Sequence, residues 1–179
     1  MSVVLIGYRG SGKTTIGRAL ARELNWPFVD LDELIVQRAG GSIREIFEQR
    51  GEGAFRQLES DVLREKIPLK NQVISVGGGA VLAEENRRAI ANAGHIVIYL
   101  RAEAEELHRR IAADPATASQ RPGLTRLGGS VEEVRALLAQ REPIYRQVKT
   151  IELDVNTAGI DELVTEVLPK LKLLTATDD

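Results

Sequence analysis

Residues 7–14, Gly-Tyr-Arg-Gly-Ser-Gly-Lys-Thr, have the types and spacing of a phosphate-binding loop. An apolar run at 2–6 precedes them, and a helical pattern follows from about Thr14 through Leu24. Glycines let successive backbone N–H groups turn toward one anion, and the helix adds the positive end of its dipole. Lys13 would place a positive charge on the β- and γ-phosphates of a nucleotide, and the Thr14 hydroxyl would ligate Mg²⁺. Because the motif and both flanks match, a chance match in an ordinary turn is disfavoured.

Two carboxylates, Asp30 and Asp32, follow the next apolar run, 27–29. We expect the strand to end in them, so that alternation puts both side chains on one side, near the phosphate loop. One would hold Mg²⁺, usually through water, and the other would accept a hydrogen bond from a substrate hydroxyl and assist its deprotonation. The alternative is that one of them caps a helix that begins near Glu33. Beside a phosphate loop, the functional interpretation is favoured.

Two arginines could reach the same cleft. Arg56 lies just off an apolar helical stripe, three residues before Glu59, with which it can pair along the helix. Arg141 precedes Pro143, which should end or kink its helix and so hold the arginine near a helix end. Taken alone, each arginine is better explained as a surface charge.

Three consecutive glycines, Gly77, Gly78 and Gly79, directly follow the buried run 72–76. Glycines lose much conformational entropy on folding. They are usually found where the backbone must approach a ligand closely or adopt a positive φ. The alternative is a plain tight turn.

Residues 114–129 carry two prolines and three glycines and show no apolar period. We predict a mobile loop there. With Arg121 and Arg126 it is a candidate lid, which would bring cations over a polyphosphate and exclude water on closing. The alternative is an idle exposed loop.

The elements that must position these residues alternate between strands and helices. Helical stripes separate five short apolar runs, which predicts an α/β three-layer sandwich with a five-stranded parallel sheet, of the P-loop NTPase, nucleoside-monophosphate-kinase-like type. Ligands in such sheets bind beyond the carboxyl ends of the strands. We expect one domain over 1–173, with the lid at about 114–129 and a flexible tail at 174–179. The apolar runs are 2–6, 27–29, 72–76, 96–100 and 150–153.

Composition narrows the class of protein. The 179 residues are 43% hydrophobic and 28% charged, which suits one soluble domain with a real core. The net charge of −2 provides no basic footprint for nucleic acid, and the absence of cysteine rules out disulfides and fits a reducing compartment. His95 and His108 are far apart in the sequence, so zinc ligation is disfavoured. Strand-sized apolar runs and a strand at the N-terminus predict neither membrane spans nor a targeting peptide, and hence a cytoplasmic protein.

Taken in order, these pieces resemble shikimate kinase over nearly the whole chain. The phosphate loop alone is generic, whereas the Phe-Arg-x-x-Glu and Arg-x-Pro-x-Tyr pieces are absent from unrelated P-loop kinases. The segments that carry the resemblance are 10–18, 30–32, 52–59, 77–81, Arg121-Pro122 and 141–145.

The resemblance implies transfer of the ATP γ-phosphoryl group to the 3-hydroxyl of shikimate, a step toward chorismate and the aromatic amino acids. It implies ATP and shikimate as small-molecule partners, Mg²⁺ as cofactor and a monomer. Lys13, Asp32 and Arg121 would be catalytic, and Thr14 and Asp30 would serve the metal. The implied ATP ligands are Gly10, Ser11, Gly12, Lys13, Thr14, Thr15, Arg110 and Arg121, and the implied shikimate ligands are Asp32, Arg56, Gly77, Gly78, Gly79 and Arg141.

The chain departs from the family pattern in the lid. The family usually continues Arg-Pro-Leu-Leu, whereas Gly123 stands after Pro122 here, and the stretch 111–120 is a few residues longer than is usual in the family. These differences bear on lid dynamics and on the contact of Arg110 with adenine.

Two other functions remain open. A gluconate-type kinase would share the loop and a carboxylate substrate, but it does not predict the Phe-Arg-x-x-Glu or triple-glycine pieces. A kinase-like module that binds without catalysis would predict losses at Lys13, Asp32, Arg56 or Arg141, and all four are present. A GTPase is disfavoured because no Asn-Lys-x-Asp stretch occurs.

Overall fold

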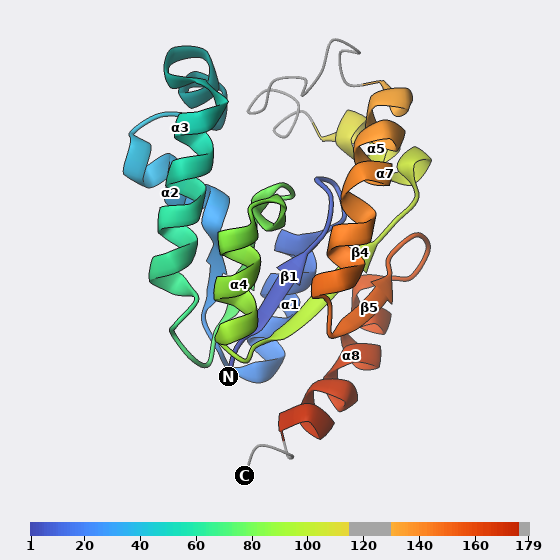
Figure 1. The fold of residues 1–179 in the computed structure, drawn as a ribbon. Helices are drawn as coiled ribbons and strands as arrows, with labels where there is room; N and C mark the ends of the chain where they lie inside the picture. The colour runs from blue at the N-terminus through green and yellow to red at the C-terminus, as the bar shows by residue number, and fades with distance from the viewer. Residues whose placement is uncertain (115–129, 176–179) are drawn as a thin grey trace.

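A parallel five-stranded sheet lies at the centre of the computed structural model, which describes residues 1–114 and 130–175. The strand order is β2-β3-β1-β4-β5, and every neighbouring pair is parallel (Figure 1). In Figure 1 the carboxyl ends of the strands point to the top of the view, and both chain ends lie at the bottom. The strands are β1 (Val3–Ile6), β2 (Phe28–Asp30), β3 (Val73–Ser75), β4 (Ile96–Arg101) and β5 (Ile151–Asp154).

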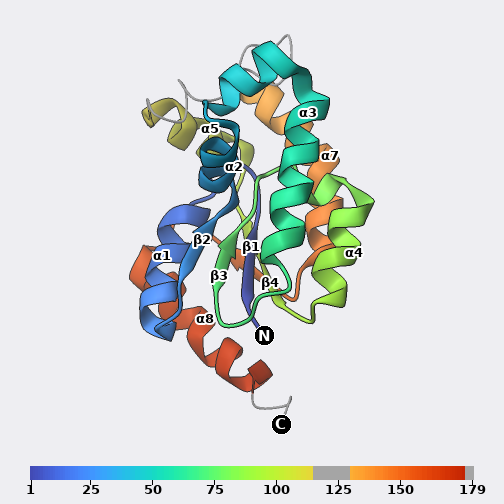
Figure 2. The ribbon, with the colours of Figure 1, turned by 90° about the vertical axis from the view of Figure 1, so that its left-hand side faces the viewer.

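Helices cover both faces of the sheet, as Figure 2 shows: α1 and α8 lie on one side, and α3 and α4 lie on the other. The predicted three-layer α/β sandwich is therefore confirmed. The helices are α1 (Lys13–Leu24), α2 (Leu31–Ala39), α3 (Ile43–Lys66), the 3₁₀ turn η1 (Ala80–Leu82), α4 (Glu84–Asn92), α5 (Ala104–Ala113), α7 (Val131–Val148) and α8 (Ile160–Thr175).

The central strand β1 divides the core in two. Its four side chains are all buried, and alternation sends Val3 and Leu5 to one face and Val4 and Ile6 to the other. The first pair packs with residues of α1, α5 and α8, and the second with residues of α2, α3 and α4. A strand covered on both faces is apolar throughout, which is why this run is recognisable in the sequence.

Non-helical backbone at Gly51 (φ 80°, ψ 169°) divides α3 into two helical segments. Helix α7 differs from the sequence-based expectation, because Pro143 does not end it and the helix continues to Val148. Proline removes one hydrogen bond, and the buried Tyr145 beyond it still packs in the core. The expectation that Arg141 lies near a helix end was therefore wrong.

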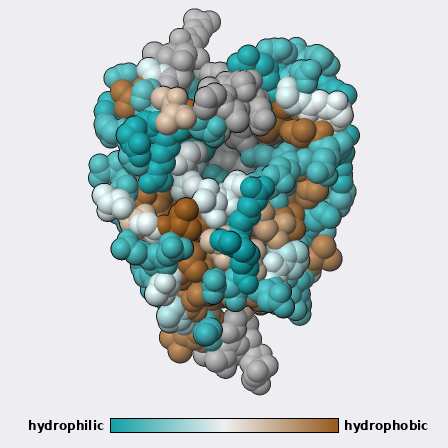
Figure 3. Space-filling view, turned by 180° about the vertical axis from the view of Figure 1, so that it is seen from behind, coloured by the Kyte–Doolittle hydropathy of each residue, from teal (hydrophilic) through white to brown (hydrophobic). Residues whose placement is uncertain are grey.

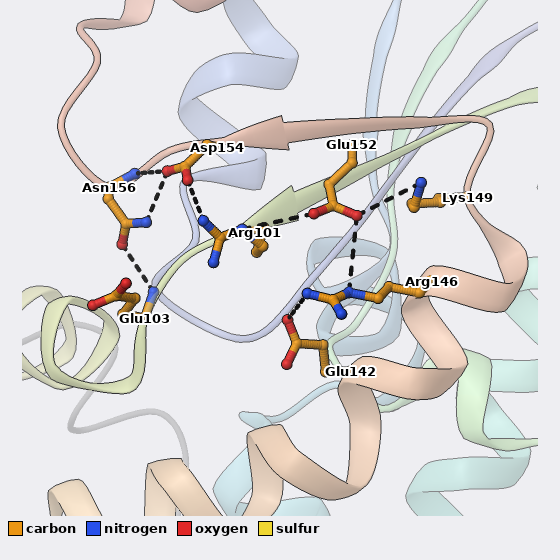
Figure 4. Close-up of polar contacts among 8 residues, drawn as sticks. All are labelled: Arg101, Glu103, Glu142, Arg146, Lys149, Glu152, Asp154 and Asn156. Carbon is orange, nitrogen blue, oxygen red and sulfur yellow. Dashed lines mark hydrogen bonds and ion pairs between the residues drawn. The ribbon is translucent and has the colours of Figure 1, made fainter.

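Charged side chains join the edge strand β5 to its neighbours (Figure 4). Arg101 on β4 pairs with Asp154, its register partner on β5, and with Glu152 at 3.6 Å. Glu152 also faces Arg146 of α7 at 3.9 Å and Lys149 at 3.6 Å. Partly exposed pairs of this kind contribute about 0–1 kcal/mol each to stability.

The face seen from behind is mostly hydrophilic, and hydrophobic residues show there as separate patches among polar ones (Figure 3). Within 1–114 and 130–175, each helix is too short or too polar to cross a membrane. The tail predicted at 174–179 begins within α8, which extends to Thr175.

Candidate active site

The phosphate loop joins β1 to α1 at the carboxyl edge of the sheet. Gly10 and Gly12 have φ values of 81° and 89°, a region that residues other than glycine rarely adopt. Gly12 is the N-cap of α1, and the helix begins at Lys13, one residue earlier than predicted. These left-handed turns aim the loop and the helix N-terminus at a common point, the arrangement that binds a phosphate group.

Lys13 and Thr14 extend from the start of α1. The ammonium of Lys13 donates hydrogen bonds to the carbonyl oxygens of Gly7 and Tyr8, both at 2.9 Å, so it lies over the loop. The Thr14 hydroxyl donates to Oδ2 of Asp30 at 2.8 Å. The loop therefore presents a cation beside an adjoining hydroxyl and carboxylate, which is the donor set of a magnesium nucleotide site.

The two aspartates lie together, although not by strand alternation. β2 ends at Asp30 and α2 begins at Leu31, so Asp32 belongs to the first helical turn and the expected strand geometry was wrong. Asp30 is the N-cap of α2, and its Oδ1 accepts the Asp32 backbone N–H at 3.0 Å. Capping and functional interpretations are thus compatible, because one oxygen of Asp30 caps the helix while the other meets Thr14.

A cavity of about 650 Å³ opens beside the loop, within the usual size range of small-ligand sites. It brings together both aspartates, the loop and Arg110. Arg56 and Arg141 do not line it. Its walls include Arg9, Gly10, Gly12, Lys13, Thr14, Thr15, Asp30, Asp32, Ser75 and Arg110.

Because Gly77–Gly79 carry no side chains, Glu59, Arg56 and the phosphate loop can lie close to their backbone. A Cβ atom at Gly77 would collide with Oε1 of Glu59, and one at Gly79 would lie 2.5 Å from Nη1 of Arg56. A Cβ atom at Gly78 would lie 3.2 Å from the carbonyl oxygen of Gly7 in the phosphate loop. None of the three glycines has a positive φ, so close approach is the reason for them.

Arg56 is held by carboxylates of its own helix. It pairs with Glu59 at 2.8 Å, as predicted, and with Glu52 at 3.3 Å. Burial is the largest single influence on the pKa of the Arg56 guanidinium and lowers it, but the charges and hydrogen bonds of Glu59 and Glu52 together outweigh burial, so the net direction is upward. The Glu59 side chain is 1% exposed, so this pair fixes the guanidinium next to Gly79.

Arg141 is not a surface charge, because only 8% of it is exposed. Its guanidinium lies 5.3 Å from the centre of the Tyr8 ring, over the phosphate loop. Burial raises the pKa of the Tyr8 hydroxyl, and the charges of Arg9 and Arg141 oppose the shift. Both arginines therefore contribute positive potential at the same point of the loop.

Arg110 lines the cavity from α5. Its Nε donates to Glu106 at 2.7 Å, and its Nη2 donates to the backbone carbonyls of Val155 and Asn156. The guanidinium is thus anchored beyond the end of β5. Arg121 and Arg126 lie outside the described residues, and so does the lid apart from Asp114.

The shikimate kinase family model matches residues 9–172. The chain belongs to the shikimate kinase family. A shikimate kinase from Rhodopirellula baltica is 44% identical over 165 residues, which cover 92% of this chain and 87% of that protein. One from Nitrosococcus oceani is 43% identical over 171 residues, covering 96% and 87%. The sequence-based family assignment is confirmed.

Solved structures agree. A shikimate kinase from Acinetobacter baumannii in complex with shikimate superposes with a TM-score of 0.87 at 34% identity, covering 95% of this chain and 92% of that one. A gluconokinase from Sinorhizobium meliloti gives 0.65 at 18% identity, covering 98% and 94%, which shows a shared fold. The shikimate kinase match covers nearly the whole fold, so the chain has the predicted P-loop, nucleoside-monophosphate-kinase-like architecture.

Sequence reasoning assigned no role to Arg9 or Tyr145. Arg9 lines the cavity, and Tyr145 donates a hydrogen bond to the Gly78 carbonyl oxygen. A charged residue inside the phosphate loop was a usable signal for Arg9. The contact of Tyr145 spans 67 residues, and no local pattern could have indicated it.

Proposed function

We propose that the chain transfers the γ-phosphoryl group of ATP to the 3-hydroxyl of shikimate, giving ADP and shikimate 3-phosphate. The observation that carries this proposal is the convergence at Gly77–Gly79, where the phosphate loop, Asp32 and the Arg56–Glu59 pair come within contact of one short backbone segment. The phosphate loop and the Arg56 guanidinium, which could bind the carboxylate of a substrate, therefore lie at the same edge of the sheet. Family membership and the shikimate-bound neighbour support the same substrate.

The nucleotide side rests on residues 10–15. Their backbone N–H groups and the N-terminus of α1 bind the phosphates, with Lys13 on the β- and γ-phosphates. Lys13 now bonds two loop carbonyls, so phosphate oxygens would compete for an ammonium that is already in place. Arg110 contacts the adenine, and Arg121 brings a further cation to the phosphates.

The acceptor side uses Arg56 and Arg141 for the carboxylate and Asp32 for the hydroxyl edge. Guanidinium groups form charge-assisted, sometimes forked hydrogen bonds to a carboxylate, which lysine cannot copy. The 3-hydroxyl oxygen forms a bond to the γ-phosphorus while the bond to the β-phosphate oxygen breaks, and Asp32 accepts the hydroxyl proton. Gly77, Gly78 and Gly79 provide backbone contact. Catalysis here needs positioning and charge neutralisation more than a strong base.

Magnesium fits the residues present. Mg²⁺ prefers oxygen ligands and keeps waters, binding through one or two protein groups and the substrate phosphates. Thr14 and Asp30 offer a hydroxyl and a carboxylate oxygen 2.8 Å apart. Residues 1–114 and 130–175 contain no cluster of three or more His, Cys, Asp or Glu side chains that could hold a metal ion. Thr14 would ligate the ion directly and Asp30 through water. When bound, the ion neutralises phosphate charge that develops during transfer.

We also propose that the chain acts as a cytoplasmic monomer with a single domain over 1–173. The buried faces of the sheet are covered by the chain's own helices, which favours this state. Analytical ultracentrifugation checks the prediction, and a stable dimer would contradict it.

The test of the function is a coupled ADP-release assay with shikimate, with gluconate and without acceptor. We expect release only with shikimate and Mg²⁺, and its loss in EDTA. Turnover with gluconate alone would support the second kinase, and nucleotide binding without turnover on either acceptor would support a binding module.

A further inference from the structure

Tyr145 lies between the two halves of the proposed acceptor site. Arg56 belongs to α3 and Arg141 to α7, and the loop Gly77–Gly79 runs between them. The Tyr145 hydroxyl, on α7, donates a buried hydrogen bond to the carbonyl oxygen of Gly78. The middle glycine is therefore tied to the helix that carries the second arginine.

The Tyr145 side chain is itself held firmly. It is fully buried, and its ring packs on Tyr99 with the ring centres 5.1 Å apart. Burial raises the pKa of the Tyr145 hydroxyl to about 12, so the group stays a neutral donor over the pH range of an ordinary enzyme assay. A rigid donor on a packed helix fixes its acceptor more narrowly than a mobile one would.

A displacement of the Gly77–Gly79 loop would move both arginines that are proposed to bind the acceptor, Arg56 and Arg141. Gly79 contacts the Arg56 guanidinium so closely that it leaves no room for a methyl group. On the other side, Arg141 precedes Tyr145 by one helical turn and therefore lies on the same face of α7. One hydrogen bond thus couples the placement of the two guanidinium groups.

We propose that Tyr145 is a positioning residue for the acceptor, which sets the separation of the Arg56 and Arg141 guanidinium groups by holding Gly77–Gly79 against α7. This inference rests on the proposed function. It requires no contact between Tyr145 and either substrate.

The test compares Tyr145→Phe with Tyr99→Phe. Both tyrosines are buried and stacked on each other, but in the described part of the chain the Tyr99 hydroxyl has no hydrogen-bond partner. Tyr145→Phe removes the hydrogen bond to Gly78 and the interaction of the hydroxyl with the Arg141 guanidinium. We expect it to raise KM for shikimate about two- to tenfold and to leave KM for ATP within about twofold. Tyr99→Phe should leave both KM values unchanged.

A second readout needs no catalysis. The amide N–H groups of Ala80 and Leu82 bond the carbonyls of Gly77 and Gly79, both at 3.0 Å, so their hydrogen exchange reports on the loop. Exchange at both should be faster in Tyr145→Phe than in wild type or Tyr99→Phe, when measured well below the melting temperatures. If the wild-type chain fails to turn over shikimate, the proposed function fails, and exchange still decides whether Tyr145 orders the loop.

The inference is overturned if exchange and the shikimate KM both match those of Tyr99→Phe. It is also overturned if KM rises equally for shikimate and ATP, because that result indicates general loosening. Should Tyr145→Phe prove much less stable, direct titration of shikimate and ATP binding at low temperature replaces the kinetic comparison. Weaker binding of shikimate alone then supports the inference, and unchanged or equally weakened binding of both ligands overturns it.

Discussion

The phosphate loop and the acceptor site are built in opposite ways. The loop is one continuous stretch, in which Lys13 bonds carbonyls five and six residues earlier in the chain. The proposed acceptor site is assembled from α3, from the loop after β3 and from α7, with a hydrogen bond that spans 67 residues. A local site can form wherever its strand–loop–helix unit forms, whereas an assembled site depends on the packing of the whole domain. Disturbances in the core should therefore reach shikimate binding before nucleotide binding.

Lys13→Ala tests the local region and has the largest expected effect. Removal of the ammonium proposed to bind the β- and γ-phosphates should lower kcat by about 10³-fold or more. The cooperativity of thermal unfolding should remain, because Lys13 lies over the loop and is not part of either hydrophobic cluster. Single-turnover kinetics and circular dichroism measure the two properties, and near-normal turnover would defeat the assignment.

Arg56→Ala and Arg141→Ala test the assembled region. Each should reduce transition-state stabilisation by about 2–4 kcal/mol, because charge-assisted hydrogen bonds are lost. This loss corresponds to a kcat/KM for shikimate that is about 30- to 1,000-fold lower. KM for ATP should change far less. Steady-state kinetics with each substrate varied in turn provide the measurement. Equal losses toward both substrates would count against the division into two regions.

Gly79→Ala separates loop placement from charge. The added methyl group would meet the Arg56 guanidinium, so Arg56 must shift and KM for shikimate should rise on the order of tenfold. Gly53→Ala in α3 is the matched control, since a Cβ atom there meets nothing within 4 Å.

Gly53→Ala should have the same KM for shikimate and the same kcat as the wild type. Its free energy of unfolding should be about 0.5–1 kcal/mol higher, because a glycine within a helix is replaced. Chemical denaturation measures that gain. If both variants behave alike in the kinetic assay, crowding at Arg56 is not what matters at Gly79.

His95 provides the smallest expected effect, away from both regions. Burial lowers the pKa of its imidazole from the ordinary 6.5. Nε2 contacts the Ile67 carbonyl oxygen at 2.6 Å, and Nδ1 accepts the Ser2 N–H at 3.4 Å, so the neutral ring suits its site. Because the unfolded chain takes up a proton first, the free energy of unfolding should fall as the pH drops below 6.5 toward the lowered pKa.

Urea denaturation of wild type and His95→Gln from neutral pH downward checks this expectation, and only the wild type should show the slope. The carboxylates with lowered pKa, such as Glu45 and Glu65, act in a different window, because their contribution is lost only as the pH falls below about 4.5. A wild-type slope that persists in His95→Gln would mean that another group causes it.

Local signals in the sequence were sufficient for the sheet, the phosphate loop and the Arg56–Glu59 pair. An apolar run covered on both faces predicts a buried strand, and a glycine-rich turn before a helix predicts a phosphate site, because each depends on neighbours in the chain. The boundary after β2 was misplaced because Asp30 is both the last strand residue and the cap of the next helix. Propensity alone does not rank two such uses of one aspartate.

The sequence alone determined the phosphate loop and a family whose members are shikimate kinases, since both depend on residue types in a fixed order. The tertiary structure decided that Arg141 is buried over Tyr8, that Gly77–Gly79 approach Glu59 and Arg56 without room for a side chain, and that Tyr145 reaches Gly78. Burial and long-range hydrogen bonds arise when helices pack on a sheet, and no stretch of chain contains that packing before the domain has folded.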